Sequence, residues 1–123
     1  MAYPSNTASG VVVAGTSVAG NALNQFGMNI RYNFVDSNGN IYIADRENSR
    51  VVRWPNGGST GSVVAGNGTD GVALSQVNFP YGLWVDSSSN LFVVEYSNHR
   101  VTRWAAGSTL GVVVAGTTNS TGR

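Results

Sequence analysis

The chain has 123 residues, of which only 11% are charged, and a formal net charge of +1. This length is typical of a single domain, and so weak a charge argues against nucleic acid or an anionic membrane as a partner. The absence of cysteine excludes a disulfide framework and a thiolate metal site, and no run approaches the roughly 20 apolar residues of a membrane-spanning helix. The composition leaves the compartment open.

Residues 1–10 are polar and uncharged, and we expect them to form a disordered or extended leader that precedes an extra strand at 11–15. Beyond them, short apolar runs bounded by Gly, Asn, Ser and Pro recur without a helical period, which is typical of many short strands. The next four runs predict strands at 32–36, 40–45, 50–54 and 62–65.

The same four runs return about fifty positions later and predict strands at 82–86, 90–95, 100–104 and 112–115. A fixed period of this length marks one supersecondary unit used repeatedly, and propeller blades have periods of roughly 40–50 residues. Asn38-Gly39 joins the first two runs with a hairpin turn, because Asn-Gly tolerates positive φ. Four strands joined in this way form an antiparallel meander.

The second strand of each unit indicates what the meander packs against. All four residues of 41–44 are apolar, and so are all four of 91–94. A strand with one wet face would alternate apolar with polar residues, so these strands are expected to be covered on both faces, as in radially stacked blades. The sequence therefore predicts an all-β fold with about two propeller blades, at 16–66 and 67–116, followed by a tail at 117–123.

One charge pattern supports this register. Asp45 and Arg50 flank a short loop and are expected to face each other across a hairpin, and Glu95 and Arg100 hold the same spacing. We interpret both as structural pairs that fix the hairpin. A catalytic role is not expected, because a neighbouring arginine keeps each carboxylate ionised.

Several of these residues resemble a known family, the NHL repeat, named for its Asn-His-Leu signature. The stretch from Asn90 to Val101 contains Asn98-His99-Arg100 and resembles that signature, and 79–86 resembles the family's opening strand and Asp turn. The first copy departs from the pattern, since Asn48-Ser49-Arg50 lacks the histidine. The resemblance covers roughly 11–116 and implies a β-propeller, commonly six-bladed, but it does not imply one function.

Two blades do not close a ring, because propellers need about four to eight. We therefore expect the chain to form a homo-oligomer or to be a piece of a longer array. A trimer of two-blade chains, with six blades, is favoured, and a tetramer would give eight. The strand at 11–15 is a third copy of the fourth strand of the repeat. If each chain donated it head to tail to a neighbouring chain, the result would be a ring where the rotation closes and a fibre where it does not. The alternative is that 11–15 only marks where a fragment was cut.

The sequence offers little for catalysis. His99 is the only histidine, and a packing or loop role fits it better than metal binding. The family that the chain resembles includes amidating lyases, which need several histidine ligands for a metal. This chain has one histidine and so lacks that ligand set. The stretch Gly57-Gly58-Ser59-Thr60-Gly61 has the Gly-x-Ser-x-Gly spacing, but it is expected to be a loop rather than the strand-to-helix turn that a nucleophile needs. We therefore expect no enzyme activity, no metal and no cofactor.

Binding residues are expected on the loops that join second to third strands and fourth to first strands. The candidates there are Arg31, Arg46, Asn48, Tyr96, Asn98 and His99. Trp54, Trp84 and Trp104 are expected to pack between blades. The leading hypothesis is a non-catalytic interaction module that binds protein or another ligand. The alternatives are a structural repeat protein that assembles by strand donation and, ranked lower, an RNA-binding propeller or a lyase.

Overall fold

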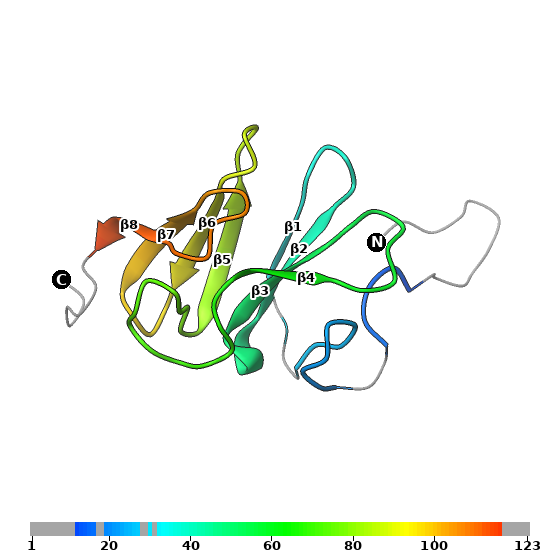
Figure 1. The fold of residues 1–123 in the computed structure, drawn as a ribbon, viewed down its shortest axis with the longest axis horizontal. Helices are drawn as coiled ribbons and strands as arrows, with labels where there is room; N and C mark the ends of the chain where they lie inside the picture. Colours follow the sequence, from blue (N-terminus) through cyan, green and yellow to red (C-terminus); the bar gives the residue numbers. More distant parts are fainter. Residues whose placement is uncertain (1–11, 17–18, 28–29, 31, 117–123) are drawn as a thin grey trace.

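The computed structural model describes residues 12–16, 19–27, 30 and 32–116. Eight strands form two four-stranded antiparallel sheets, each in sequence order (Figure 1). Blade 1 contains β1 (Asn33–Val35), β2 (Ile41–Asp45), β3 (Arg50–Trp54) and β4 (Ser62–Ala65), with the short 3-10 helix η1 (Arg46–Asn48) between β2 and β3. Blade 2 contains β5 (Pro80–Val85), β6 (Leu91–Glu95), β7 (Arg100–Trp104) and β8 (Val112–Gly116).

The predicted all-β fold with two antiparallel meanders is confirmed. The clearest boundary difference is at β5, which begins at Pro80 rather than at 82 because it contains a register shift opposite β6. Residues 12–16 carry no strand within this single chain. A strand at 11–15 that pairs with another copy therefore stays a prediction.

Each first hairpin is closed by an aspartate. Asp86 Oδ1 accepts hydrogen bonds from the backbone N–H groups of Ser88 and Asn90, both at 2.9 Å, and its Oδ2 accepts one from Asn90 Nδ2 at 3.1 Å. Asp36 has the same arrangement with Asn38 and Asn40. The Asp86 carboxylate is stabilised first by the Asn90 backbone N–H and then by the Asn90 side chain, so its pKa lies below the ordinary value.

This lowered pKa predicts acid sensitivity at the hairpin. A carboxylate whose folded pKa lies below its unfolded value stabilises the fold above the unfolded value, about 3.9, and loses that contribution as the pH falls through the folded value. We expect the free energy of unfolding to decline from just below pH 4 downward. Asp86→Asn should remove part of that decline, as measured by urea unfolding at a series of pH values. An NMR titration that placed the Asp86 pKa at or above 3.9 would contradict the prediction.

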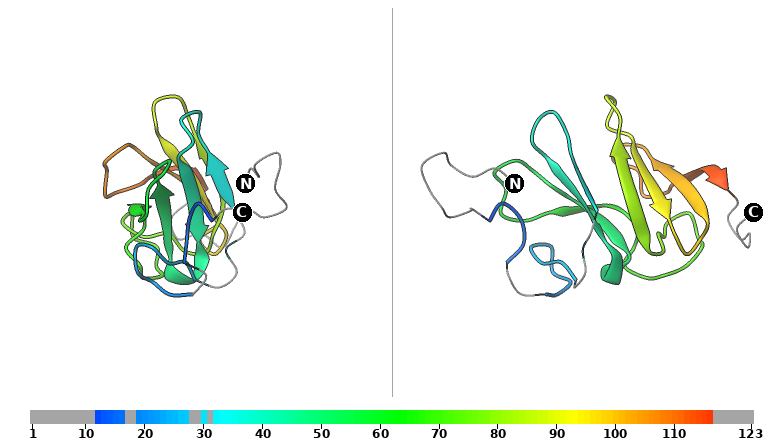
Figure 2. Two further views of the ribbon diagram at one scale, coloured as in Figure 1. Left: turned by 90° about the vertical axis from the view of Figure 1, so that its right-hand side faces the viewer. Right: turned by 180° about the vertical axis from the view of Figure 1, so that it is seen from behind.

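The two blades pack face to face. Figure 2 shows the sheets side by side, and β5 contacts both β1 and β2. Residues from both sheets form one apolar core between the blades: Tyr42, Val51, Ala65, Val77, Val85, Leu91, Val93 and Trp104. A second cluster lies on the far face of blade 1 and contains Phe26, Ile43, Val52 and Trp54, with Ala14 and Ile41 packed against it.

Burial of the second strands follows from this packing. Every residue of β2 is buried or half-buried, whereas Val94 of β6 is exposed. Blade 1 has packed groups on both faces, while the outer face of blade 2 lacks a neighbour within the described chain. Trp54 and Trp104 are buried as expected for blade packing. Trp84 lies 6.4 Å from Phe34 of blade 1, measured between ring centroids, but it is 55% exposed because the rest of its ring faces the uncovered side of blade 2.

None of the helical structure in the described residues is long and apolar enough to cross a membrane.

Candidate functional site

The candidate binding residues lie at one end of the blades, which we call the loop face (the lower edge of Figure 1). It consists of η1, the turn between β6 and β7, and the segments 19–27 and 67–79 that precede each blade. The structure places Arg46 and Asn48 in η1, and Tyr96, Asn98 and His99 in the β6–β7 turn. Arg31 lies outside the described residues.

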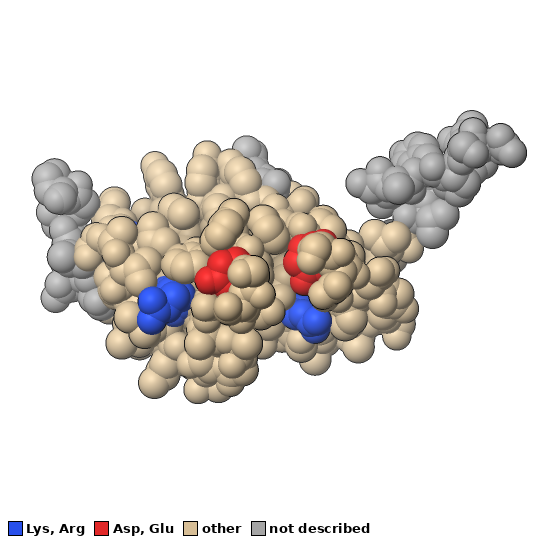
Figure 3. All heavy atoms as spheres, turned by 90° about the horizontal axis from the view of Figure 1, so that it is seen from above, with Lys and Arg blue, Asp and Glu red and all other residues tan. Residues whose placement is uncertain are grey.

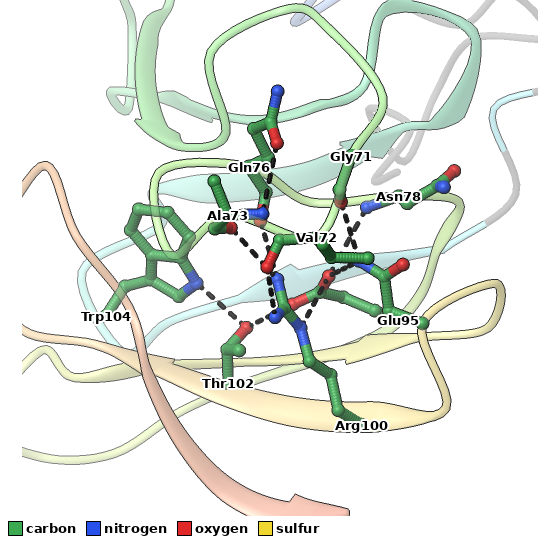
Figure 4. Close-up of polar contacts among 10 residues, drawn as sticks. Gly71, Val72, Ala73, Gln76, Asn78, Glu95, Arg100, Thr102 and Trp104 are labelled. Carbon is green, nitrogen blue, oxygen red and sulfur yellow. Dashed lines mark hydrogen bonds and ion pairs between the residues drawn. The ribbon is translucent and has the colours of Figure 1, made fainter. Parts of the chain in front are cut away.

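A buried ion pair organises the loop face of blade 2 (Figure 4). Glu95 and Arg100 have fully buried side chains, and Arg100 Nε lies 3.1 Å from Glu95 Oε1, as an ion pair without hydrogen-bond geometry. The Arg100 guanidinium donates to the carbonyl oxygens of Val72 at 2.8 Å, Ala73 at 3.2 Å and Gln76 at 3.1 Å. One arginine therefore holds the shape of the 67–79 segment.

Blade 1 repeats this design with a shorter acid. Arg50 Nε lies 3.0 Å from Asp45 Oδ2. The same guanidinium donates to the carbonyl oxygens of Asn21, Ala22 and Gln25 at 2.9 to 3.1 Å. In each pair the acid and the arginine face each other across a ladder, β2–β3 in blade 1 and β6–β7 in blade 2, in the register that the sequence spacing predicts.

The two asparagines anchor the same segments. Asn98 is buried, and its Nδ2 donates to Gly71 O and to Glu95 Oε1, both at 2.8 Å. Asn48 Nδ2 donates in the same way to Gly20 O at 2.9 Å and to Asp45 Oδ2 at 2.8 Å. Both amide groups thus connect a hairpin to the segment before its blade, and little of Asn98 is accessible to a ligand.

His99 occupies a turn position with left-handed backbone. Its φ is 53°, and its counterpart Ser49 in blade 1 has a φ of 50°. The His99 side chain is exposed. Among the described residues, no group of three or more His, Cys, Asp or Glu side chains is arranged to hold a metal ion.

An aromatic cluster spans the two blades at the loop face, and the sequence reasoning missed most of it. Tyr81 lies 4.4 Å from Tyr32 and 5.8 Å from Tyr96, and Phe79 lies 5.5 Å from Tyr96, measured between ring centroids. The Arg46 guanidinium carbon lies 4.0 Å above the Phe79 ring, a cation–π contact between blade 1 and blade 2. The 79–86 stretch was recognised only as an opening strand, which gave no sign that its aromatic rings would meet.

The exposed part of this cluster is amphipathic. Tyr96 is 64% exposed and Tyr81 is 42% exposed. Tyrosine offers a large apolar ring with a polar tip, a combination enriched at binding interfaces. At the opposite end, Figure 3 shows only two small groups of charged residues on an otherwise uncharged surface.

Two four-stranded antiparallel meanders, packed face to face and repeated every fifty residues, define a repeat protein of the propeller-blade class. The family model of the NHL repeat matches residues 35–54, from the end of β1 to the end of β3. Residues 35–54 are therefore similar to an NHL repeat, and the resemblance is confirmed on the copy that lacks the signature histidine. NHL repeats build β-propellers and are generally non-catalytic interaction modules. The search of curated proteins found no match to this chain.

Proposed function

We propose that this protein is a non-catalytic interaction module that assembles head to tail from two-blade chains and binds a protein or another ligand on its loop face. The observation that carries the assembly is a correspondence between surfaces. The outer faces of the blade pair repeat the two halves of the interface already formed inside the chain.

A partly open cavity of about 320 Å³ lies between the two blades. Blade 2 lines it with Ser89, Leu91, Ala105, Ala106 and Gly107, among others. A groove of about 780 Å³ on the far face of blade 1, the blade 1 groove, is lined by the residues fifty positions earlier: Gly39, Ile41, Pro55, Asn56 and Gly57. The far face of blade 1 therefore has the same kind of surface as the face of blade 2 that packs against blade 1.

The complementary half lies on blade 2. Within the chain, blade 1 lines the cavity with Tyr42, Arg53, Ser62 and Val64. Fifty residues later stand Phe92, Arg103, Val112 and Val114, all at least partly exposed. Trp84 completes this outer face of blade 2, where its ring lies beside that of Phe92 with the centroids 5.8 Å apart and the planes tilted by 53°. A second copy that places this face in the blade 1 groove would repeat the packing seen inside the chain.

Ligand binding is proposed for the exposed aromatic surface of the loop face. Tyr81 and Tyr96 supply apolar area with hydroxyl groups, and Arg46 and His99 lie in the turns beside them. The low overall charge favours a protein or an uncharged ligand over RNA. The buried, arginine-paired carboxylates Asp45 and Glu95 support a structural role rather than acid–base catalysis.

The assembly is tested by substituting one residue at each end of the blade pair. Trp84→Asp places a charge on the outer face of blade 2, and Val35→Asp places one in the blade 1 groove. Burying an unpaired charge is costly, so either variant should reduce the mass of the wild-type oligomer, measured by light scattering over a concentration series, to that of one chain. Mixing the two variants should give a discrete dimer, because each retains one intact face.

Tyr96→Asp is the matched control, since Tyr96 is an exposed aromatic residue away from both docking faces. It should leave the mass unchanged. A wild-type protein that stays monomeric at every concentration would refute the assembly. Wild-type complexes of three or four chains would indicate closed rings of six or eight blades, and we expect the three-chain complex. Open-ended growth would favour a structural role in fibres.

A further inference from the structure

The leading segment 12–15 lies where the fourth strand of a preceding blade would lie. Ala14 packs against the cluster that contains Phe26, Ile43 and Trp54. Within the chain, Ala65 of β4 packs in one core with Val77, Val93 and Trp104, which stand fifty or fifty-one positions after those three residues. Blade 1 therefore holds the leading segment as blade 2 holds β4.

The backbone supports the same correspondence. Gly15 has a φ of +85° and lies so close to Phe26 that an added Cβ would be 3.3 Å from its ring. Gly66, at the end of β4, has a φ of +89°, and its added Cβ would be 2.8 Å from Val77. Among the described residues, no inner strands pair with the leading segment to complete its blade.

A second copy can supply those three strands. Residues 10–16 read Gly-Val-Val-Val-Ala-Gly-Thr, and residues 111–117 read the same seven letters. The second of these stretches contains β8, which pairs with β7. The leading segment of one copy therefore carries the side chains that β7 of another copy already accepts, and in the same order.

The two identical strands compete for one place. If blade 2 of a second copy enters the blade 1 groove, its β8 and the resident leading segment would both occupy the fourth-strand position. Inside the chain, the fourth strand of blade 1 continues into the segment 67–79, whose carbonyl oxygens bind Arg100. The leading segment continues in the same way into 19–27, whose carbonyl oxygens bind Arg50.

We propose, building on the head-to-tail assembly above, that residues 12–15 pair with β7 of a second copy and displace that copy's own β8. The exchange replaces one strand by another of identical sequence, so the strand pairing itself is nearly balanced. The net gain is the apolar area buried between the outer face of blade 2 and the blade 1 groove. Each chain thereby donates one strand and receives one.

Two matched variants of the chain test the exchange. Val13 in the leading segment is 47% exposed, and Val114, its counterpart in β8, is 44% exposed, so aspartate at either site should leave both blades folded. Val13→Asp is expected to weaken association at least tenfold, because the charge would be buried between two copies. Val114→Asp is expected to preserve or strengthen association, because the exchange takes β8, and Val114 with it, out of the docking face, and the substitution loosens the strand that must leave. Light scattering on both variants measures this.

The opposite pattern would overturn the proposal, since it would mean that β8 stays and the leading segment leaves. Equal effects of the two variants would also overturn it. If the wild-type chain does not associate at all, the head-to-tail assembly fails as well, whereas association with the wrong variant pattern sinks only the exchange.

Disulfide trapping gives a second readout, because the chain has no cysteine of its own. Val101 pairs with Ala115 in the β7–β8 ladder, so the exchange predicts that Val101 meets Ala14 of another copy. Oxidation of the Ala14→Cys, Val101→Cys variant should produce a ladder of cross-linked chains, while the control Val101→Cys, Ala115→Cys closes within one chain where β8 remains paired. Absence of the ladder from an associated sample would overturn the proposal.

Discussion

Replacing Glu95 by alanine is expected to lower the free energy of unfolding by about 3–5 kcal/mol, the range for breaking a buried ion pair from one side. The substitution leaves the Arg100 guanidinium, which is fully buried, without its counter-charge. It also removes the acceptor for Asn98 Nδ2 and for the Thr102 hydroxyl, which donates to Glu95 Oε2 at 2.7 Å. Equilibrium unfolding in urea measures the change.

Glu95→Gln is the control for this experiment. The amide preserves the shape of the side chain and retains one oxygen acceptor, but it removes the charge, so its cost should fall between those of the wild type and Glu95→Ala. A loss below about 1 kcal/mol for Glu95→Ala, the size typical of an exposed salt bridge, would show that the pair does not hold the 67–79 segment.

Gly66→Ala is expected to destabilise the protein by roughly 2–5 kcal/mol, from two costs that add. The residue has a φ of +89°, which a side chain disfavours by about 1–2 kcal/mol. In addition, the new Cβ would lie 2.5 Å from the Ser49 carbonyl oxygen and 2.8 Å from Val77 Cγ2, so the backbone must shift, at a typical overpacking cost of about 1–3 kcal/mol.

Gly107→Ala separates the two costs. Gly107 has a similar φ of +78°, but an added Cβ there meets nothing within 4 Å. It should therefore show only the backbone part, about 1–2 kcal/mol. Equal losses for the two glycines, measured by the same urea unfolding, would refute the steric part of the argument.

The features predicted well from the sequence are those that depend on local spacing. The Asp45–Arg50 and Glu95–Arg100 pairs follow from a five-residue separation around a tight turn, and the β6–β7 register follows with them. Turn chemistry was a weaker guide. Ser89 takes a φ of 66° in the turn where Gly39 takes 84°, so the serine turn adopts nearly the geometry of the Asn-Gly turn. The matching hydrogen bonds of Asp36 and Asp86, each of which closes its own hairpin, explain why.

The features that sequence spacing did not predict depend on contacts between distant segments. The carbonyl oxygens that bind Arg100 belong to a segment 24 to 28 positions earlier, and nothing in that segment's side chains indicates the contact. The Tyr32–Tyr81 contact spans nearly a whole repeat. Trp84 was expected to pack between blades, and its ring does lie 6.4 Å from Phe34 of blade 1, but 55% of the residue stays exposed because nothing in the described chain covers its other side.

The acidic residue of the buried ion pair differs between the two repeats, and the residue that it faces on the next strand differs as well. Glu95 faces Thr102, whose hydroxyl donates to the acid and accepts a hydrogen bond from Trp104 Nε1 at 3.0 Å. In blade 1 the shorter Asp45 accompanies Val52, and Trp54 Nε1 donates instead to Gly58 O at 2.8 Å. A consensus repeat that averaged the two copies position by position could join valine to glutamate, or threonine to aspartate. Either mixture would bury a polar atom without a partner, so designers of longer arrays from this chain should transfer these positions as a set.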